Sequence, residues 1–135
     1  LRPNRFVTKK IVKQVSEIKS GLRDSLSLGN VNIYRDWGWA PEYVEAMHLM
    51  LESSTPDDYI ISSGTSNSLK KFVNLAFQYF DLNPDKFIKI DNSFIRPADI
   101  TYSAMNPKKI LKNLGWKAEK DLEYIVKSMI ENKLY

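Results

Sequence analysis

The sequence predicts a helix-rich, mixed α/β fold in one domain of residues 1–135. Five segments repeat apolar residues at spacings of three and four, which is typical of amphipathic helices. Three shorter segments between them alternate polar with apolar residues or concentrate β-branched and aromatic ones, as strands do. A content of 43% hydrophobic and 27% charged residues is the ordinary balance of a globular domain with its own core.

The first expected helix runs from about Phe6 to Ser20, with Gly21 as its stop. The second begins near Pro41, a favourable first helical residue, and is expected to turn three apolar side chains inward, those of Val44, Met47 and Leu51. The third, over residues 69–80, has the clearest periodicity, because its apolar positions follow i, i+3, i+4, i+7 and i+11.

The last two expected helices lie near the end of the sequence. A cap followed by proline, Asn106-Pro107, predicts a fourth helix from Asn106 to about Leu114, closed by Gly115. We expect Trp116 to make a hydrophobic contact that anchors the end of this helix. The fifth helix spans about Leu122 to Asn132 and has its own apolar stripe.

Three strands are expected, at Ser25–Leu28, at Asp58–Ser62 just before Gly64, and at Phe87–Ile90. Helices mixed with short strands indicate an α/β or α+β arrangement. No strand leads through a glycine-rich turn into a helix, so these residues contain no dinucleotide-binding fingerprint.

Composition excludes several kinds of site. The sequence has no cysteine, which excludes disulfides and thiolate zinc sites, and its one histidine, His48, excludes a multi-histidine metal site. We interpret His48 as a structural or partly exposed residue, and we expect no catalytic residue and no metal ligand in this chain. A net charge of +4 is too small by itself to indicate nucleic-acid binding, and no apolar run approaches the roughly 20 residues of a membrane span. The absence of cysteine fits a cytoplasmic location.

Polar and basic residues at the ends of the expected elements are the candidates for binding. Leu28-Gly29-Asn30 closes the first strand, and Arg35 and Arg96 lie on separate loops. Arginine suits bidentate contact with phosphate oxygens, so the two could hold a diphosphate. The alternative is that they form internal salt bridges with neighbours such as Asp36 or Asp99, and spacing alone does not separate the two interpretations.

The basic start of the first helix is open to two interpretations in the same way. It could be a solvated helix face, or Lys10 could direct its ammonium group at an anionic ligand near the helix N-terminus.

Several motifs occur in the order found in one family. They are Phe6-Val7-Thr8-Lys9-Lys10-Ile11, Ser27-Leu28-Gly29-Asn30, Arg35-Asp36-Trp37-Gly38, Tyr43-Val44-Glu45-Ala46-Met47, Ser62-Ser63-Gly64, Arg96-Pro97-Ala98-Asp99 and Leu114-Gly115-Trp116. Together they resemble the substrate-binding C-terminal portion of GDP-mannose 4,6-dehydratases, which are NADP-dependent members of the extended short-chain dehydrogenase/reductase superfamily. The resemblance extends over essentially the whole chain and implies the corresponding portion of that fold, without most of the Rossmann domain.

The resemblance also implies roles for individual residues. Arg2 falls where the family has an arginine that contacts NADP, although the loop before Phe6 departs from the usual pattern. Val7 and Lys10 fall where the diphosphate and the nearby base of the nucleotide sugar are approached. The segment Leu28-Gly29-Asn30 matches the lining of the guanine pocket.

Three further residues match the phosphate and ribose contacts of the family. Arg35 and Arg96 fall at the two diphosphate-binding arginines, and Asp99 falls at an acidic residue that binds ribose hydroxyls. The family often has glutamate at this last position, and aspartate is shorter by one methylene.

The catalytic Tyr–Lys pair, a threonine, a glutamate and the glycine-rich NADP loop lie upstream of this region in the family. The resemblance therefore implies that these residues belong to a longer chain with an upstream NADP-binding Rossmann domain, and that the isolated 135 residues are inactive. The implied whole enzyme is a lyase that converts GDP-mannose to GDP-4-keto-6-deoxymannose and water in deoxyhexose biosynthesis. Its implied partners are GDP-mannose and further copies of itself, as a dimer or tetramer, with no nucleic acid and no membrane.

Two alternatives remain at this point. The chain could belong to another nucleotide-sugar epimerase, reductase or dehydratase, because the residues that separate these activities lie upstream of the matched motifs. It could also be a small non-enzymatic binding module that uses its basic face for a nucleotide, a nucleic acid or a protein.

Overall fold

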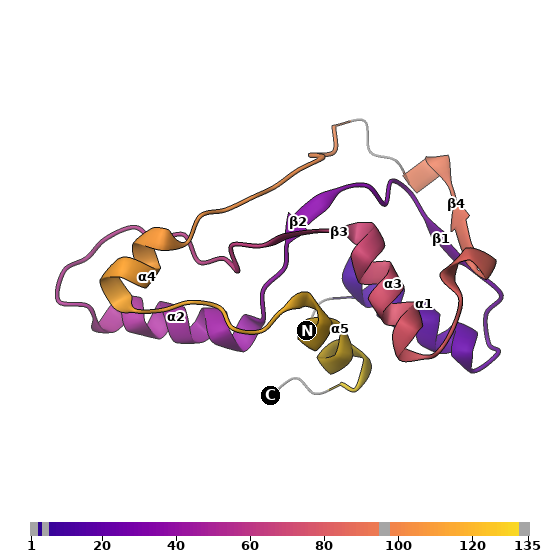
Figure 1. Ribbon diagram of the computed structural model, residues 1–135, viewed down its shortest axis with the longest axis horizontal. Helices are drawn as coiled ribbons and strands as arrows, with labels where there is room; N and C mark the ends of the chain where they lie inside the picture. Colours follow the sequence, from indigo (N-terminus) through magenta and orange to yellow (C-terminus); the bar gives the residue numbers. More distant parts are fainter. Residues whose placement is uncertain (1–2, 4–5, 95–97, 133–135) are drawn as a thin grey trace.

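The computed structural model describes residue 3 and residues 6–94 and 98–132. The molecule is elongated, with α1, α3, α5, β1 and β4 gathered in one lobe and α2 and α4 in the other (Figure 1). The elements in chain order are α1 (Val7–Lys19), β1 (Leu26–Leu28), β2 (Tyr34–Asp36), α2 (Ala40–Glu52), β3 (Ser66–Ser68), α3 (Leu69–Tyr79), η1 (Pro84–Lys86), β4 (Ile88–Ile90), η2 (Asn92–Phe94), α4 (Lys108–Leu114) and α5 (Leu122–Ile130). None of the described helices is long and apolar enough to cross a membrane.

Two small two-stranded sheets join segments that are far apart in the sequence. β1 pairs with β4 in parallel, with Leu26 opposite Ile88 and Leu28 opposite Ile90. β2 pairs with β3 in antiparallel fashion, with Arg35 opposite Asn67. The second sheet lies between the two lobes (Figure 1). Its pairing holds β2 in place beside the larger lobe.

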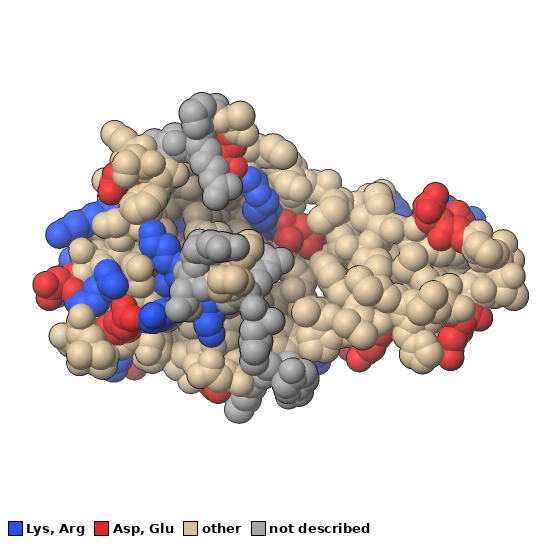
Figure 2. Space-filling view, turned by 180° about the vertical axis from the view of Figure 1, so that it is seen from behind, with Lys and Arg blue, Asp and Glu red and all other residues tan. Residues whose placement is uncertain are grey.

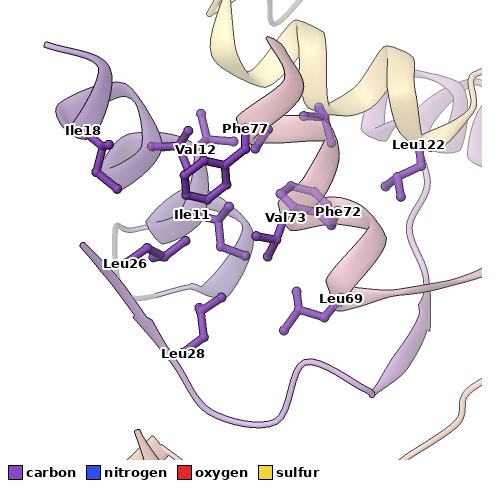
Figure 3. Packing of buried hydrophobic residues seen from close by; sticks show 13 residues of the cluster. Ile11, Val12, Ile18, Leu26, Leu28, Leu69, Phe72, Val73, Phe77 and Leu122 are labelled. Carbon is purple, nitrogen blue, oxygen red and sulfur yellow. The ribbon is translucent and has the colours of Figure 1, made fainter. Parts of the chain in front are cut away.

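The main core lies between α1, α3 and α5 and is closed by β1. Ile11, Phe72 and Phe77 are fully buried there and point toward one another, and Leu26 and Leu28 reach the same cluster from β1 (Figure 3). Each such side chain contributes about 1.5–3 kcal/mol relative to an exposed one, so this cluster holds α1 rigidly against the end of β1.

The smaller lobe has a second core under α2. Ala46, Ile110 and Trp116 are buried together, and the Trp116 indole N–H donates to the Glu42 carbonyl over 3.1 Å. The Glu42 carboxylate, 8% exposed, accepts hydrogen bonds from the backbone N–H groups of residues 119 and 120. A buried carboxylate requires such partners, so Glu42 holds the segment after α4 against α2.

All five predicted helices are present, with ends that differ from the predicted ones by a few residues at most. Gly21 ends α1 with φ +73°, and Gly115 caps α4 with φ +68°, as expected for left-handed stops. Asn106 accepts a hydrogen bond from the Lys108 N–H over 3.0 Å, although the helix itself begins at Lys108. The prediction that Trp116 anchors this end is confirmed by its burial.

The predicted inner face of α2 is wrong. Val44, Met47 and Leu51 are 62%, 52% and 86% exposed, whereas Glu42 and Ala46 are the buried residues of this helix. Periodicity shows which residues share a face, but it does not show which face the neighbouring segments cover. Here the described residues cover the face of Ala46.

The predicted strands are confirmed at two of three places. β1 and β4 fall inside the first and third predicted segments. The segment Asp58–Ser62 is not a strand, because it has no ladder partner among the residues that the structure describes. The sheet of β2 and β3 was not predicted, because its three-residue strands are polar and acquire their pairing only through long-range contact.

Candidate functional site

A cleft of about 830 Å³ opens beside the N-terminus of α1 and the carboxyl end of β1. It is lined by Phe6, Val7, Lys10, Leu28, Gly29, Asn30, Ile33, Arg35, Asp36, Trp37, Leu69, Ser93, Phe94 and Asp99. These residues come from α1, β1, β2, α3, η2 and the connecting segments, so the cleft exists only in the folded chain. Its lining combines apolar walls with a few charged groups, as nucleotide and cofactor sites usually do.

Lys10 lies in the first turn of α1 and lines the cleft. Its Nζ donates to the Ser27 carbonyl over 2.9 Å and lies 4.1 Å from the centre of the Phe94 ring. Burial lowers the pKa of Lys10, the positive charge of Arg23 lowers it further, and Asp91 partly opposes both effects. The ammonium has three N–H groups and one of them is used by Ser27, so it can still donate to an anion.

The end of β1 forms the next wall. The Leu28 carbonyl accepts a hydrogen bond from the Asp91 N–H over 2.8 Å, and the Asn30 side chain accepts one from the Asn32 N–H over 2.9 Å. Gly29 lies so close to η2 that an added Cβ would be 2.8 Å from the Phe94 carbonyl oxygen. Only glycine fits this close approach without moving backbone.

Arg35 lies on β2 and turns its guanidinium toward residues 99–100. Nη1 donates to the carbonyls of Tyr34 and Ile100 over 2.8 and 2.5 Å, and Nη2 donates to Asp99 Oδ1 over 2.9 Å. The side chains of Arg35 and Asp99 are each 28% exposed. The internal salt bridge considered for Arg35 is therefore formed, with Asp99 as the partner.

Asp36, the next residue on β2, binds the backbone of the segment that leads into β3. Its two carboxylate oxygens accept hydrogen bonds from the Ser63 and Gly64 N–H groups over 3.0 and 2.9 Å. The neighbouring Tyr43 hydroxyl has its pKa raised to about 12, first by burial and then by the negative charge of Asp36. Asp36 thus anchors the strand that carries Arg35.

The sequence match decides the family. A family profile described as GDP-mannose 4,6 dehydratase matches residues 1–129. The chain belongs to the GDP-mannose 4,6-dehydratase family. The resemblance inferred from the motifs is thereby confirmed.

Relatives in this family are longer than the chain. GDP-mannose 4,6 dehydratase 1 of Arabidopsis thaliana is 39% identical over 133 residues, which are 98% of this chain and 37% of the relative. GDP-mannose 4,6 dehydratase of Homo sapiens is 30% identical over 142 aligned positions, covering 93% of this chain and 38% of the relative. The chain thus spans a little over a third of the length of these curated relatives.

Solved structures confirm the fold at lower identity. The structure of RMD from Pseudomonas aeruginosa complexed with NADPH matches with a TM-score of 0.86 at 18% identity, over 97% of this chain and 43% of that one. dTDP-glucose 4,6-dehydratase from Bacillus anthracis in complex with NAD matches with a TM-score of 0.79 at 14% identity, over 96% and 39%. The chain therefore shares its fold with portions of these two longer proteins, and the predicted helix-rich, mixed α/β fold is confirmed.

Seven of the nine predicted site residues line the same cleft of this family member. They are Val7, Lys10, Leu28, Gly29, Asn30, Arg35 and Asp99. Arg2 and Arg96 lie outside the described residues, so their predicted contacts with NADP and diphosphate stay predictions.

Other lining residues were not predicted as part of a site. Ile33, Ser93 and Phe94 belong to none of the motifs that indicated a site, and they reach the cleft only through the fold. Trp37, which also lines the cleft, packs against Phe72 with ring centres 5.6 Å apart.

The remaining polar residues provide no further reactive cluster in the described part of the chain. His48 is exposed on α2 and lies 3.6 Å from Glu52, which confirms its interpretation as a partly exposed residue. No group of three or more metal-ligating side chains is found among the residues that the structure describes.

Proposed function

We propose that this chain is the substrate-binding part of an NADP-dependent GDP-mannose 4,6-dehydratase, a lyase longer than these 135 residues. The observation that carries the proposal is the convergence of seven predicted contact residues on one cleft, from segments up to 92 positions apart. Membership in the dehydratase family gives that cleft its proposed ligand, GDP-mannose.

The lining suits a nucleoside diphosphate sugar at two points. The apolar side chain of Leu28 and the backbone beside Gly29 line the cleft and would face the guanine, as the resemblance to the family implies. Arg35 and Lys10 would meet the diphosphate, since both retain N–H groups for charge-assisted hydrogen bonds. The cleft would thus bind and orient the substrate.

Catalysis is assigned to other residues of the proposed longer protein. The proposed reaction oxidises C4 of the mannose, eliminates water across C5–C6 and reduces C6 with the same hydride. The described cleft has no histidine, and its two carboxylates are already engaged, Asp36 by the Ser63 and Gly64 N–H groups and Asp99 by Arg35. NADP would supply the hydride, but these residues do not fit NADP by themselves, because the chain has no glycine-rich turn between a strand and a helix.

The surface of the smaller lobe is consistent with a further domain of the proposed longer protein that packs against α2. Val44, Met47 and Leu51 form an exposed apolar face, and the same lobe contains the extended segment 58–62, which pairs with no strand among the described residues. On the face seen in Figure 2 this lobe has a broad uncharged surface with acidic side chains toward its edges, whereas lysines and arginines gather over the other lobe. Large exposed apolar patches normally mark contact surfaces, so we assign this face to the remainder of the longer polypeptide.

Equilibrium binding to the full-length protein tests the ligand. Binding of GDP in preference to UDP, CDP and dTDP is expected, and preference for a pyrimidine nucleotide would contradict the GDP assignment. Replacing Arg35 with alanine should weaken GDP binding by about 10- to 100-fold, because charge-assisted hydrogen bonds contribute about 1.5–3 kcal/mol. The control Lys112→Ala removes an exposed cation outside the cleft and should leave the affinity unchanged.

Two leucines of similar exposure test the domain contact. Leu51, 86% exposed on α2, would be buried against the proposed domain, whereas Leu22, 81% exposed, follows α1 in the other lobe. In the full-length protein Leu51→Asp should lower the free energy of unfolding by about 1.5–3 kcal/mol. Leu22→Asp should change it by about 0.5 kcal/mol or less. Equal effects of the two substitutions would remove the support for this contact.

A further inference from the structure

Lys10 is held at the cleft by two groups that leave its charge uncompensated. Its Nζ donates to the Ser27 carbonyl and also lies over the Phe94 ring. It forms no salt bridge with a carboxylate of the residues that the structure describes. A carbonyl and an aromatic ring attract a cation through partial charges, whereas a carboxylate would neutralise it. The ammonium is therefore fixed in place and keeps its full charge for an anionic ligand.

The backbone of η2 sets the position of the Phe94 ring. The Asp91 N–H donates to the Leu28 carbonyl over 2.8 Å, which ties the start of this segment to the end of β1. The Asp91 carboxylate accepts hydrogen bonds from the Ser93 N–H and hydroxyl over 2.9 and 2.6 Å, and the Asp91 carbonyl accepts one from the Phe94 N–H over 3.1 Å. The Phe94 backbone lies against Gly29, where an added Cβ would be 2.8 Å from its carbonyl oxygen. The ring therefore has a defined place beside the end of β1.

We propose that Phe94 is a positioning residue, whose ring holds the Lys10 ammonium in place for the diphosphate of the bound nucleotide. This inference rests on the proposed nucleotide-binding function and adds to it a residue that no sequence motif singled out. The Phe94 side chain is 51% exposed and belongs to neither buried cluster, so packing of the core does not account for its position. A lysine side chain is long and flexible, so holding it before the ligand arrives lowers the entropy cost of binding.

A double-mutant cycle on the full-length protein, measured by isothermal titration of GDP, tests the positioning role. Phe94→Leu should weaken GDP binding by about 3- to 10-fold, because the cation–π contact is lost. Phe94→Tyr keeps the ring and should retain GDP affinity within about twofold of the parent. In the Lys10→Met background Phe94→Leu should change GDP affinity by about twofold or less, since its effect passes through Lys10. Tyr124→Leu is the matched control and should leave GDP affinity unchanged, because the Tyr124 ring lies 5.1 Å from Lys120 Nζ outside the cleft.

Guanosine, which lacks the phosphates, separates positioning of Lys10 from direct contact between Phe94 and the base. Phe94→Leu should leave guanosine affinity within about twofold of the parent while GDP affinity falls. Both ligands are titrated into the same sample, so an inactive fraction of the variant does not alter the ratio of the two affinities. Equal losses of GDP and guanosine affinity that persist in the Lys10→Met background would overturn the positioning role, and so would an unchanged GDP affinity in Phe94→Leu. A parent protein that does not bind GDP would overturn the proposed function itself, which separates the two failures.

Discussion

Gly29 provides the sharpest test of the cleft, because a single methyl group there must displace backbone. In Gly29→Ala the new Cβ would be 2.8 Å from the carbonyl oxygen, 2.9 Å from the carbonyl carbon and 3.1 Å from the Cβ of Phe94. Ordinary contacts begin near 3.4 Å, so η2 must move outward by about 0.6 Å. The φ of Gly29 is not positive, so alanine causes no backbone strain of its own there.

That movement reaches the proposed ligand site directly. The Phe94 ring lies 4.1 Å from the Lys10 ammonium, and both residues line the cleft with Gly29. Overpacking of this kind costs about 1–3 kcal/mol. If about 1–2 kcal/mol of that cost destabilises the GDP-bound protein relative to the free protein, GDP affinity falls by about 5- to 30-fold.

The assay is isothermal titration of GDP into the full-length protein, with thermal unfolding measured on the same samples. Gly21→Ala is the matched control, because Gly21 has φ +73° but has nothing within 4 Å of an added Cβ. It should lower the free energy of unfolding by about 1 kcal/mol through backbone strain and leave GDP affinity unchanged. Affinity of Gly29→Ala within twofold of the parent would show that η2 yields without disturbing the site, and the reasoning would be refuted.

Three further predictions concern the smaller lobe and the residues beside the site. Glu42→Ala should lower the free energy of unfolding by about 2–4 kcal/mol, because two N–H groups at residues 119–120 lose their acceptor. Urea unfolding followed by tryptophan fluorescence measures this change. A loss of less than about 1 kcal/mol would contradict the prediction. Tyr43 has its pKa raised to about 12 by burial and then by Asp36, so the folded state binds this proton more tightly and stability should fall as the pH rises from about 10 to 12. Absorbance titration should show this late phase disappear in Tyr43→Phe and move to lower pH in Asp36→Asn, and an unchanged titration would reject the assignment. His48→Ala should change stability by about 0.5 kcal/mol or less and leave GDP affinity intact, because the side chain is exposed and far from the cleft lining.

Much of the secondary structure followed from local sequence. The five helices were predicted because each carries its own apolar periodicity, and the glycines after α1 and α4 adopt the left-handed conformation expected of helix stops. The end of β1 was identified as a candidate site for a similar local reason, since Leu28-Gly29-Asn30 follows an alternating segment. These features depend on residues within a few positions of one another.

Long-range contact decided the remainder. Nothing near Arg35 in the sequence shows that its partner is Asp99, 64 positions away, and nothing in the polar segments of β2 and β3 predicts that they pair. Phe94 was missed for the same reason, because it enters the cleft through the pairing of β1 with β4.

The sequence by itself determined the family, the helices and half of the residues that line the cleft, because motif order and periodicity are properties of the chain. Only the tertiary structure decided which face of α2 is covered, that segment 58–62 stays unpaired among the described residues, and which oxygens hold Arg35. A helix with apolar residues on both sides, an extended segment and an arginine each have several possible partners of similar energy. The choice among them is made by packing between distant segments, which local pattern does not encode.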